Sequence, residues 1–290
     1  MSPLPGLMAA GGRARDRVGF AIVWAAGSVV VAALTALVVS MLRAGGSGVS
    51  FAYLVSLPER AGIDGGIASV VVSTLLLLLV ALAAAAPLGL LTAVLLFEAT
   101  RTPRTAKLVS RSLDVLACVP SIVFGLFGMK LFCEVIGLGW SILSGGLTLA
   151  CMIMPVVVRS TEQALRDVPA DQRLACAALG TSRWGALLHV LVPAATPGIV
   201  AGIVLATGRA LAETAAVLYT AGASLRMPAS LIDPGRALAV HVYTLAIEIP
   251  GGAPRATSAA LVLLVLVGLT NALAYCGSAV FRRWRLGSAA

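Results

Sequence analysis

The chain has 290 residues, of which 59% are hydrophobic and 11% are charged, and its mean hydropathy is +1.01. This composition excludes a soluble globular domain of the same length, because the surface of such a domain needs far more polar residues. The net charge of +9 does not indicate nucleic-acid binding, since the basic residues are spread over several loops without interleaved aromatic residues.

Six apolar runs reach the length of about 20 residues that a helix needs to cross the hydrocarbon of a bilayer. They predict an all-α membrane protein with six transmembrane helices, at residues 18–42, 67–97, 113–132, 140–158, 197–221 and 256–280. The first run is too long for the apolar part of a signal peptide and precedes no small-residue cleavage site, so we expect an uncleaved span. The second is longer than a simple span and contains Pro87, which predicts a tilted, kinked or extended helix.

The basic residues predict the orientation of these spans. One set of loops carries fourteen of them, Arg13, Arg15, Arg17, Arg101, Arg104, Lys107, Arg111, Arg159, Arg166, Arg173, Arg183, Arg282, Arg283 and Arg285, whereas the other set carries six, Arg43, Arg60, Lys130, Arg226, Arg236 and Arg255. By the positive-inside rule, both termini are expected in the cytoplasm. The predicted organisation is a tail of residues 1–17, one membrane domain of residues 18–280 and a tail of residues 281–290.

The longest predicted cytoplasmic connection covers residues 159–195 and has an architecture of its own. A short helix is expected over residues 171–179, with Gly180 at its left-handed end and Thr181 or Ser182 as the cap of a second helix. In that second helix Trp184, Leu187, Leu188 and Leu191 follow helical spacing and form one apolar stripe. The stripe predicts either docking on another protein or packing on the chain's own spans, and the pattern does not distinguish the two.

Arg209 and Glu213 are the only charged residues in the apolar run of residues 200–219. A charge at the centre of a bilayer costs roughly 2.5–3.5 kcal/mol on insertion scales, so such a pair indicates a functional site. On one continuous helix both residues share a face with Gly198, Gly202 and other small residues, and this face is expected to contact protein or a water-filled path. The alternative is an ion pair that only fixes helix packing.

Several kinds of chemistry find no support in the sequence. The only lysines, Lys107 and Lys130, do not follow glycine, so the sequence does not contain the GK[ST] ending of a phosphate-binding P-loop. The chain is therefore not expected to hydrolyse ATP. The five cysteines show no metal-ligand spacing, and neither His189 nor His241 belongs to a recognisable catalytic set. We therefore expect no cofactor, no metal and no enzymatic activity.

The connecting loop resembles the EAA loop of bacterial ABC-importer permeases. Leu174, Ala175 and Cys176 occupy the EAA positions, Gly180 follows after three residues, and the segment Val190 to Pro193 follows nine residues later, as in the pattern EAA, G, I-x-LP. The resemblance implies a type I ABC-importer permease fold, in which this loop couples to a separate ATPase. It assigns coupling roles to Leu174, Ala175, Gly180, Trp184, Leu187 and Pro193. Leu174 replaces the acidic residue of the pattern, which removes a charge-assisted contact but keeps an apolar docking face.

Other segments are similar to the phosphate-specific permeases of the PstA type. They are Asp64 to Ile67, Ala86 to Gly89, Val119 to Gly125, and Arg209 to Ala215, which reads RALAETA beside that family's RAIGETA. The similarity extends from about residue 64 to the C-terminus. It implies half of a phosphate pathway, completed by a PstC-type permease, a PstB-type ATPase dimer and a PstS-type phosphate-binding protein.

This family resemblance, together with charge, suggests a pathway built from Arg209, Glu213 and Ser121. Arg209 is expected to attract inorganic phosphate through its fork of N–H groups, and Glu213 to hold Arg209 and prevent overly tight binding. Ser121, beside Pro120 in the third span, offers a hydroxyl contact, although Pro120 and Ser121 equally predict a helix kink. The rival interpretations are a permease for sulfate or molybdate and a non-transporting scaffold or sensor. The external segment of residues 222–255, with a helix expected near residues 238–247, is either the landing area of the binding protein or a capping loop.

Overall fold

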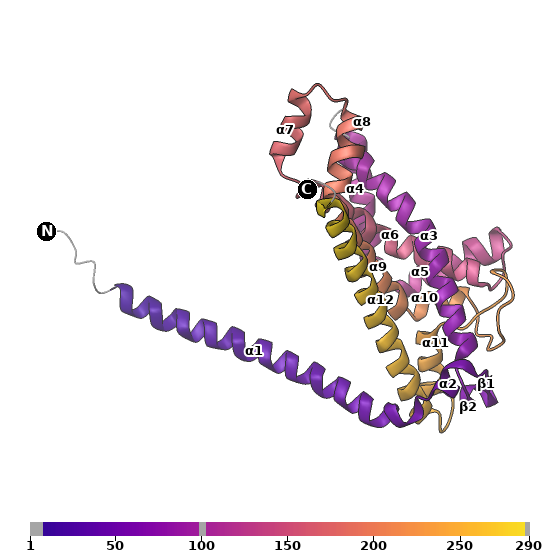
Figure 1. Cartoon of the computed structure of the whole chain (residues 1–290). Coiled ribbons are helices and arrows are strands. Elements are labelled where there is room, and N and C mark those ends of the chain that lie inside the picture. The colour runs from indigo at the N-terminus through magenta and orange to yellow at the C-terminus, as the bar shows by residue number, and fades with distance from the viewer. Residues whose placement is uncertain (1–7, 99–102, 288–290) are drawn as a thin grey trace.

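The computed structural model describes residues 8–98 and 103–287, and it is almost entirely helical (Figure 1). Five helices are long and apolar enough to cross a membrane, at Arg17–Gly48, Ala68–Glu98, Ile142–Arg166, Arg183–Ala212 and Ala253–Leu273. A sixth apolar stretch is a bent pair, Arg104–Cys118 and Ser121–Val135, with 102° between its two parts. The all-α membrane architecture predicted from composition is therefore confirmed. The predicted tails, residues 1–17 and 281–290, lie partly outside the described residues.

The main helices of the apolar stretches are α1 (Met8–Gly45), α3 (Ala68–Glu98), α4 (Pro103–Cys118), α5 (Ser121–Gly128), α6 (Ile142–Arg166), α9 (Val192–Ala212) and α12 (Ala253–Gly287). The other helical elements are η1 (Gly46–Gly48), α2 (Phe51–Val55), η2 (Arg60–Gly62), η4 (Met129–Val135), α7 (Ala170–Ala178), α8 (Arg183–Ala186), η5 (Leu187–Leu191), α10 (Ala215–Thr220), α11 (Leu238–Tyr243) and η6 (Thr244–Glu248). Strands β1 (Pro58–Glu59) and β2 (Asp64–Gly65) form one antiparallel pair, in which Pro58 faces Gly65 and Glu59 faces Asp64.

Two predicted spans are interrupted. The third was expected as one helix over residues 113–132, but the chain bends between α4 and α5, where Pro120 is extended and has no N–H to continue the helix. The fifth was expected as one helix over residues 197–221, but α9 ends at Ala212 and α10 begins at Ala215. The other predicted spans coincide with uninterrupted helices, including α3 with Pro87 inside it.

Helix α6 is the centre of the bundle and packs against α3, α9, α4, α5 and α10. Its contacts form the main apolar cluster, which contains Ile142, Ile153 and Val157 of α6, Leu77 of α3 and Phe124 of α5. Burial of such side chains stabilises each by roughly 1.5–3 kcal/mol relative to exposure to water. The cluster holds α5 and α10 beside α6 and so positions the two interruptions.

The bundle has two distinct ends in Figure 1. The segment α7–α8 projects from one end, where α4 and the last turns of α12 also lie, and α2, β1, β2 and α11 lie at the other. Helix α1 leaves the second end, contacts α12 there and then diverges from the bundle, so its apolar window is wholly exposed. The structure of this single chain therefore leaves a continuous apolar helix turned away from its own core.

Candidate functional site

The fifth span is interrupted at Glu213 and Thr214, one turn after Arg209. Arg209 is in the last turn of α9, whereas Glu213 has an extended backbone with φ −76° and ψ 128°. The Glu213 carboxylate accepts a hydrogen bond from the backbone N–H of Ala216 at 3.4 Å, at the start of α10. A negative charge there also complements the partial positive charge of a helix N-terminus. The expected single helix carrying both charges is therefore replaced by two helices with one charge at each facing end.

Arg209 is exposed, and within the described residues no hydrogen bond or ion pair holds its guanidinium. Glu213 is half-buried. The intrahelical ion pair considered from the sequence is not formed between these two described side chains. Within the described part of the chain the N–H groups of Arg209 are therefore unused hydrogen-bond donors.

The two interrupted spans are packed together just beyond their breaks. Gly125 of α5 approaches Ala216 of α10 so closely that a Cβ at residue 125 would lie 3.0 Å from the Ala216 Cα atom. Val119 and Phe124 on one side and Ala210, Leu211 and Ala216 on the other belong to the same apolar cluster. Ser121 is the half-buried first residue of α5. The structure thus brings both breaks, and the elements that carry Ser121, Arg209 and Glu213, to one cluster.

Helix α9 approaches α6 closely through the face that carries its small residues. A Cβ at Gly198 would lie 2.6 Å from the Ala164 side chain, and one at Gly202 would overlap Ser160. Close approach explains the small residues predicted to face protein. Arg209 lies beyond this contact, at the end of α9 where the face opens.

The connecting loop forms the two helices expected from its sequence. Gly180 has φ +68° and terminates α7, with the N–H groups of Gly180 and Thr181 donating to the carbonyls of Ala177 and Cys176. This is the Schellman arrangement, in which glycine avoids the strain that a Cβ suffers at positive φ. The Ser182 side chain then caps α8 by accepting from the Gly185 N–H at 3.1 Å. The local signals for both helix ends are confirmed.

The apolar stripe of the second helix is divided between two surroundings. Leu187 is 0% exposed and Leu191 is 4% exposed, and both pack on Leu165 and Ile199 of the chain's own spans. Trp184 and Leu188 are 55% and 57% exposed. Leu187 is therefore not part of an exposed docking face, because it packs on the chain's own spans, and its role in coupling stays a prediction. The same helix therefore packs on the chain's own spans through Leu187 and Leu191 and exposes apolar side chains at Trp184 and Leu188.

The remaining coupling residues predicted from the resemblance lie on the outer surface of the loop or at its exit. Leu174 and Ala175 are exposed on α7, as is Leu179 at its end, and Pro193 is half-buried in the first turn of α9. Leu188 was predicted as part of the apolar stripe but not as a coupling residue, and Leu179 was not predicted at all. Both are exposed apolar side chains of the loop, like Leu174 and Trp184.

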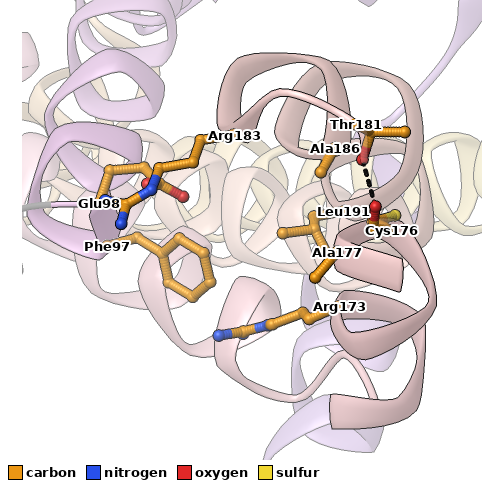
Figure 2. Close-up of a pocket in the computed structure, with 9 residues that line it drawn as sticks. All are labelled: Phe97, Glu98, Arg173, Cys176, Ala177, Thr181, Arg183, Ala186 and Leu191. Carbon is orange, nitrogen blue, oxygen red and sulfur yellow. Dashed lines mark hydrogen bonds between the residues drawn. The ribbon is translucent and has the colours of Figure 1, made fainter. Parts of the chain in front are cut away.

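Arg173 fastens α7 to the membrane helices. Its guanidinium lies over the ring of Phe97, 4.4 Å from the ring centroid, and donates to the carbonyl of Leu165 at 2.9 Å. Figure 2 shows Arg173 and Phe97 on one side of a hollow of about 330 Å³, and the hydrogen bond from Thr181 to the Cys176 carbonyl on the other. Residues of α3, α7 and α8 line this hollow. The loop is therefore in direct contact with the end of the second span.

A charged network that the sequence reasoning missed joins α4 to α6. Arg159 of α6 forms ion pairs with Asp114 of α4 and with Glu162, and it also donates to the Ser110 carbonyl at 2.8 Å. Arg166 pairs with the second oxygen of Glu162 at 2.7 Å. The spacing of Arg159, Glu162 and Arg166 at i, i+3 and i+7 is a recognisable helical signal. Ser110 and Asp114 come from another helix and carry no such signal.

The external segment contains a buried histidine. His241 of α11 is 0% exposed, and neither ring nitrogen has a hydrogen-bond partner among the residues that the structure describes. Burial, with a smaller contribution from the nearby Arg236 charge, lowers the pKa of His241 to about 4. The expected helix near residues 238–247 is confirmed as α11 and η6. Within the described ranges, no group of three or more His, Cys, Asp or Glu side chains is arranged to hold a metal ion.

Comparisons with known proteins agree with this architecture. Residues 85–284 match the family model described as the binding-protein-dependent transport system inner membrane component. A probable ABC transporter permease protein of Bacillus subtilis, YqgI, is 30% identical over 272 residues, covering 88% of this chain and 92% of the relative. The phosphate transport system permease protein PstA of Mycobacterium leprae is 39% identical over 217 residues, covering 74% of this chain and 70% of the relative.

Solved structures show the same fold at low sequence identity. An inward-facing form of the methionine ABC transporter MetNI is 18% identical with a TM-score of 0.60, covering 73% of this chain and 96% of that one. An amino acid ABC transporter crystallised with histidines is also 18% identical, with a TM-score of 0.53 and coverage of 75% and 92%. The resemblance to PstA-type permeases and the multi-pass membrane location are confirmed. Because the family model covers more than half of its length, the chain belongs to the inner membrane components of binding-protein-dependent transport systems, which are the permease subunits of ABC importers.

Proposed function

We propose that this chain is a permease subunit of an ATP-driven phosphate importer and forms half of its pathway. The exposed guanidinium of Arg209, which has no partner within the described residues and lies where α9 ends, carries the proposal. Relatives named as phosphate transport permeases, 38–39% identical over three quarters of the chain, support phosphate as the solute.

The chemistry of phosphate suits this place. Phosphate is a strongly hydrated oxyanion, so crossing a region of low dielectric requires donors that replace its water. A guanidinium offers several N–H groups in a fixed fork and stays charged at all relevant pH values. Arg209 attracts the anion, and the Glu213 charge, four residues further along the chain, limits how tightly it is held.

Interrupted spans are a recurrent way to expose polar backbone at membrane depth without exposing it to lipid. The start of α5 at Ser121 and the end of α9 near Arg209 supply such backbone, and α5 meets α10, which follows the end of α9, at Gly125 and Ala216. Ser121 adds a hydroxyl at the first position of α5. These elements form one wall of the pathway, and a second permease supplies the other wall.

The partners follow from the composition of the chain and its relatives. The chain lacks a P-loop, so ATP is hydrolysed by a separate PstB-type ATPase dimer. A PstC-type permease completes the pathway, and a PstS-type binding protein delivers phosphate at the external segment of residues 222–255. Both termini lie in the cytoplasm, as the distribution of basic residues indicates.

Coupling uses the outer surface of the loop. Leu174, Leu179, Trp184 and Leu188 are exposed and apolar, and together they offer the ATPase an anchor of the kind that dominates protein interfaces. Arg173 against Phe97, and Leu187 in the core, transmit movement of the loop to the spans. ATP binding closes the ATPases, and access then alternates between the two faces of the membrane.

Uptake of labelled phosphate by the complete complex in proteoliposomes tests the proposal. Phosphate should enter only with ATP inside and binding protein outside, and excess sulfate or molybdate should not compete. Competition by either anion would favour the second candidate, a permease for another oxyanion. ATPase activity that is unchanged when this chain is added would instead support a non-transporting scaffold.

A further inference from the structure

A basic hollow lies between α4 and α6 and shares no lining residue with the hollow beside α7 and α8. It has a volume of about 350 Å³ and is lined by Leu96, Ala106, Lys107, Ser110, Arg111, Glu162 and Arg166. Three of these side chains are cations, and they come from two helices that are far apart in the sequence. This arrangement is suited to an anion that lies beside the membrane helices.

Of the three cations that line the hollow, only Arg166 is paired with a carboxylate. One oxygen of Glu162 accepts from Arg166 and the other from Arg159, at 2.7 and 2.9 Å. Asp114 is likewise engaged by Arg159. Lys107 and Arg111 have no ion-pair partner within residues 8–98 and 103–287. The cluster therefore retains two uncompensated positive charges, which attract an anion to this place.

Helix α4 has the character of a helix that lies along a membrane surface. It is followed by the 102° bend, so it does not continue the direction of α5. Leu108 and Val115 are 67% and 68% exposed, although both are apolar, and they lie on the same side of α4. Exposed apolar side chains next to Lys107 and Arg111 match the boundary between acyl chains and headgroups. The flanking apolar surface favours a lipid over a free ion as the occupant.

We propose that this hollow binds the phosphate group of an anionic membrane lipid, such as phosphatidylglycerol, in the cytoplasmic leaflet. Lys107 and Arg111 contact the phosphate, Ser110 offers a hydroxyl, and Leu108 and Val115 lie against the acyl chains. Basic pockets between membrane helices on the cytoplasmic side bind such headgroups in other proteins. The site relies on the cytoplasmic placement of α4 but not on which solute the importer carries.

Native mass spectrometry of the intact importer, released from nanodiscs of phosphatidylcholine with or without phosphatidylglycerol, tests this site. The wild-type complex should retain phosphatidylglycerol in preference to phosphatidylcholine. Because Lys107 and Arg111 contact the phosphate directly in the proposed site, each contributing at least about 1.4 kcal/mol, Lys107→Gln or Arg111→Gln should lower retention roughly 10-fold and the double variant about 100-fold. Arg104→Gln is the matched control, because Arg104 is exposed on α4 but does not line the hollow.

Each result decides the question. Equal losses for Arg104→Gln and Lys107→Gln would mean that the surface attracts lipid without a site, and would overturn the proposal. Displacement of the lipid by millimolar inorganic phosphate, with retention of phosphate by the wild type only, would identify a free anion as the occupant and would also overturn it. Unchanged thermal stability of the variants would show that a loss of lipid is not a loss of folding.

Discussion

Arg209 and Glu213 lie on opposite sides of a helix end, with Arg209 in the last turn of α9 and Glu213 extended beyond it. The Glu213 carboxylate is directed to the N–H of Ala216 rather than to the guanidinium four residues earlier. Arg209 therefore remains exposed and uses none of its donors within the described part of the chain. The two charges therefore have different surroundings, and the roles proposed for them can be tested one at a time.

Replacing Arg209 by Gln should lower phosphate uptake by about 10- to 100-fold, because a hydrogen bond to a charged group contributes roughly 1.5–3 kcal/mol. Uptake in proteoliposomes measures the effect. Lys130→Gln is the control, since Lys130 is exposed and bound only to Glu134 at the surface. Wild-type uptake by an assembled Arg209→Gln complex would remove the assigned role of the guanidinium.

Replacing Glu213 by Gln should have a different signature. Loss of the negative charge strengthens the hold of Arg209 on the anion, so the half-saturating phosphate concentration should fall together with the maximal rate. The amide still accepts the hydrogen bond from Ala216, and the start of α10 is preserved. A maximal rate that stays at the wild-type value would show that Glu213 acts only as a helix cap.

Substitutions at Gly180 should uncouple ATP hydrolysis from transport. A Cβ at this residue meets no atom within 4 Å, so the penalty comes only from the backbone at φ +68°. This conformation destabilises an ordinary residue by roughly 1–2 kcal/mol and the β-branched valine by more, whereas asparagine tolerates it. Gly180→Val should lower the phosphate moved per ATP hydrolysed, and Gly180→Asn should keep it near the wild-type ratio. Equal ratios for the two variants would show that the turn does not transmit the motion.

The apolar stripe of the loop is buried at Leu187 but exposed at Leu188, so substitutions at these adjacent residues should have different effects. Leu187→Ala should destabilise the loop by about 2–5 kcal/mol, because Leu187 is buried in the apolar cluster. Leu188→Ala and Trp184→Ala should leave thermal stability unchanged but weaken binding of the ATPase at least 10-fold. Thermal denaturation and affinity measurements on the membrane subunits separate the two effects. Normal ATPase binding by the Trp184→Ala, Leu188→Ala double variant would place the docking surface elsewhere.

The buried His241 predicts that the external segment loosens in acid. An unfolded histidine takes up a proton near pH 6.5, whereas the pKa of folded His241 is about 4. The contribution of neutral His241 to the free energy of unfolding is therefore fully present above about pH 6.5. It decreases as the pH falls toward 4, by about 3 kcal/mol at most. Hydrogen exchange of residues 222–255 at about pH 7 and about pH 5 measures this change. His241→Leu should abolish the pH dependence, and its persistence in that variant would assign the effect to another group.

Much of the fold was predictable because its signals are local. Apolar length predicted the spans, since a helix satisfies its own backbone polar groups in lipid. Gly180 and Ser182 predicted the end of α7 and the start of α8 for a similar reason, because caps act within a few residues. The spacing from Leu174 to Pro193 predicted the family, which the comparisons confirmed.

The interruptions differ in how far the sequence reveals them. Pro120 marks the break before α5, since it lacks the N–H that a continuing helix needs. Around Glu213 no proline or glycine stands between Arg209 and Thr220, and the composition favours a continuous helix. The contact of α10 with α5 at Gly125 and Ala216 accompanies this second break, and such a contact has no signature in the segment itself.

Sequence alone determined the membrane class, the number of apolar segments, the capped loop and the family, because each depends on backbone chemistry or spacing within one segment. Only the tertiary structure decided that Leu187 is buried while Leu188 is exposed, that Arg209 has no ion-pair partner within the ranges described, and that Arg159 reaches Ser110 and Asp114 on another helix. These outcomes depend on which helices pack together. Burial and ion pairing are properties of neighbours that are distant in sequence, and no periodicity within one helix records them.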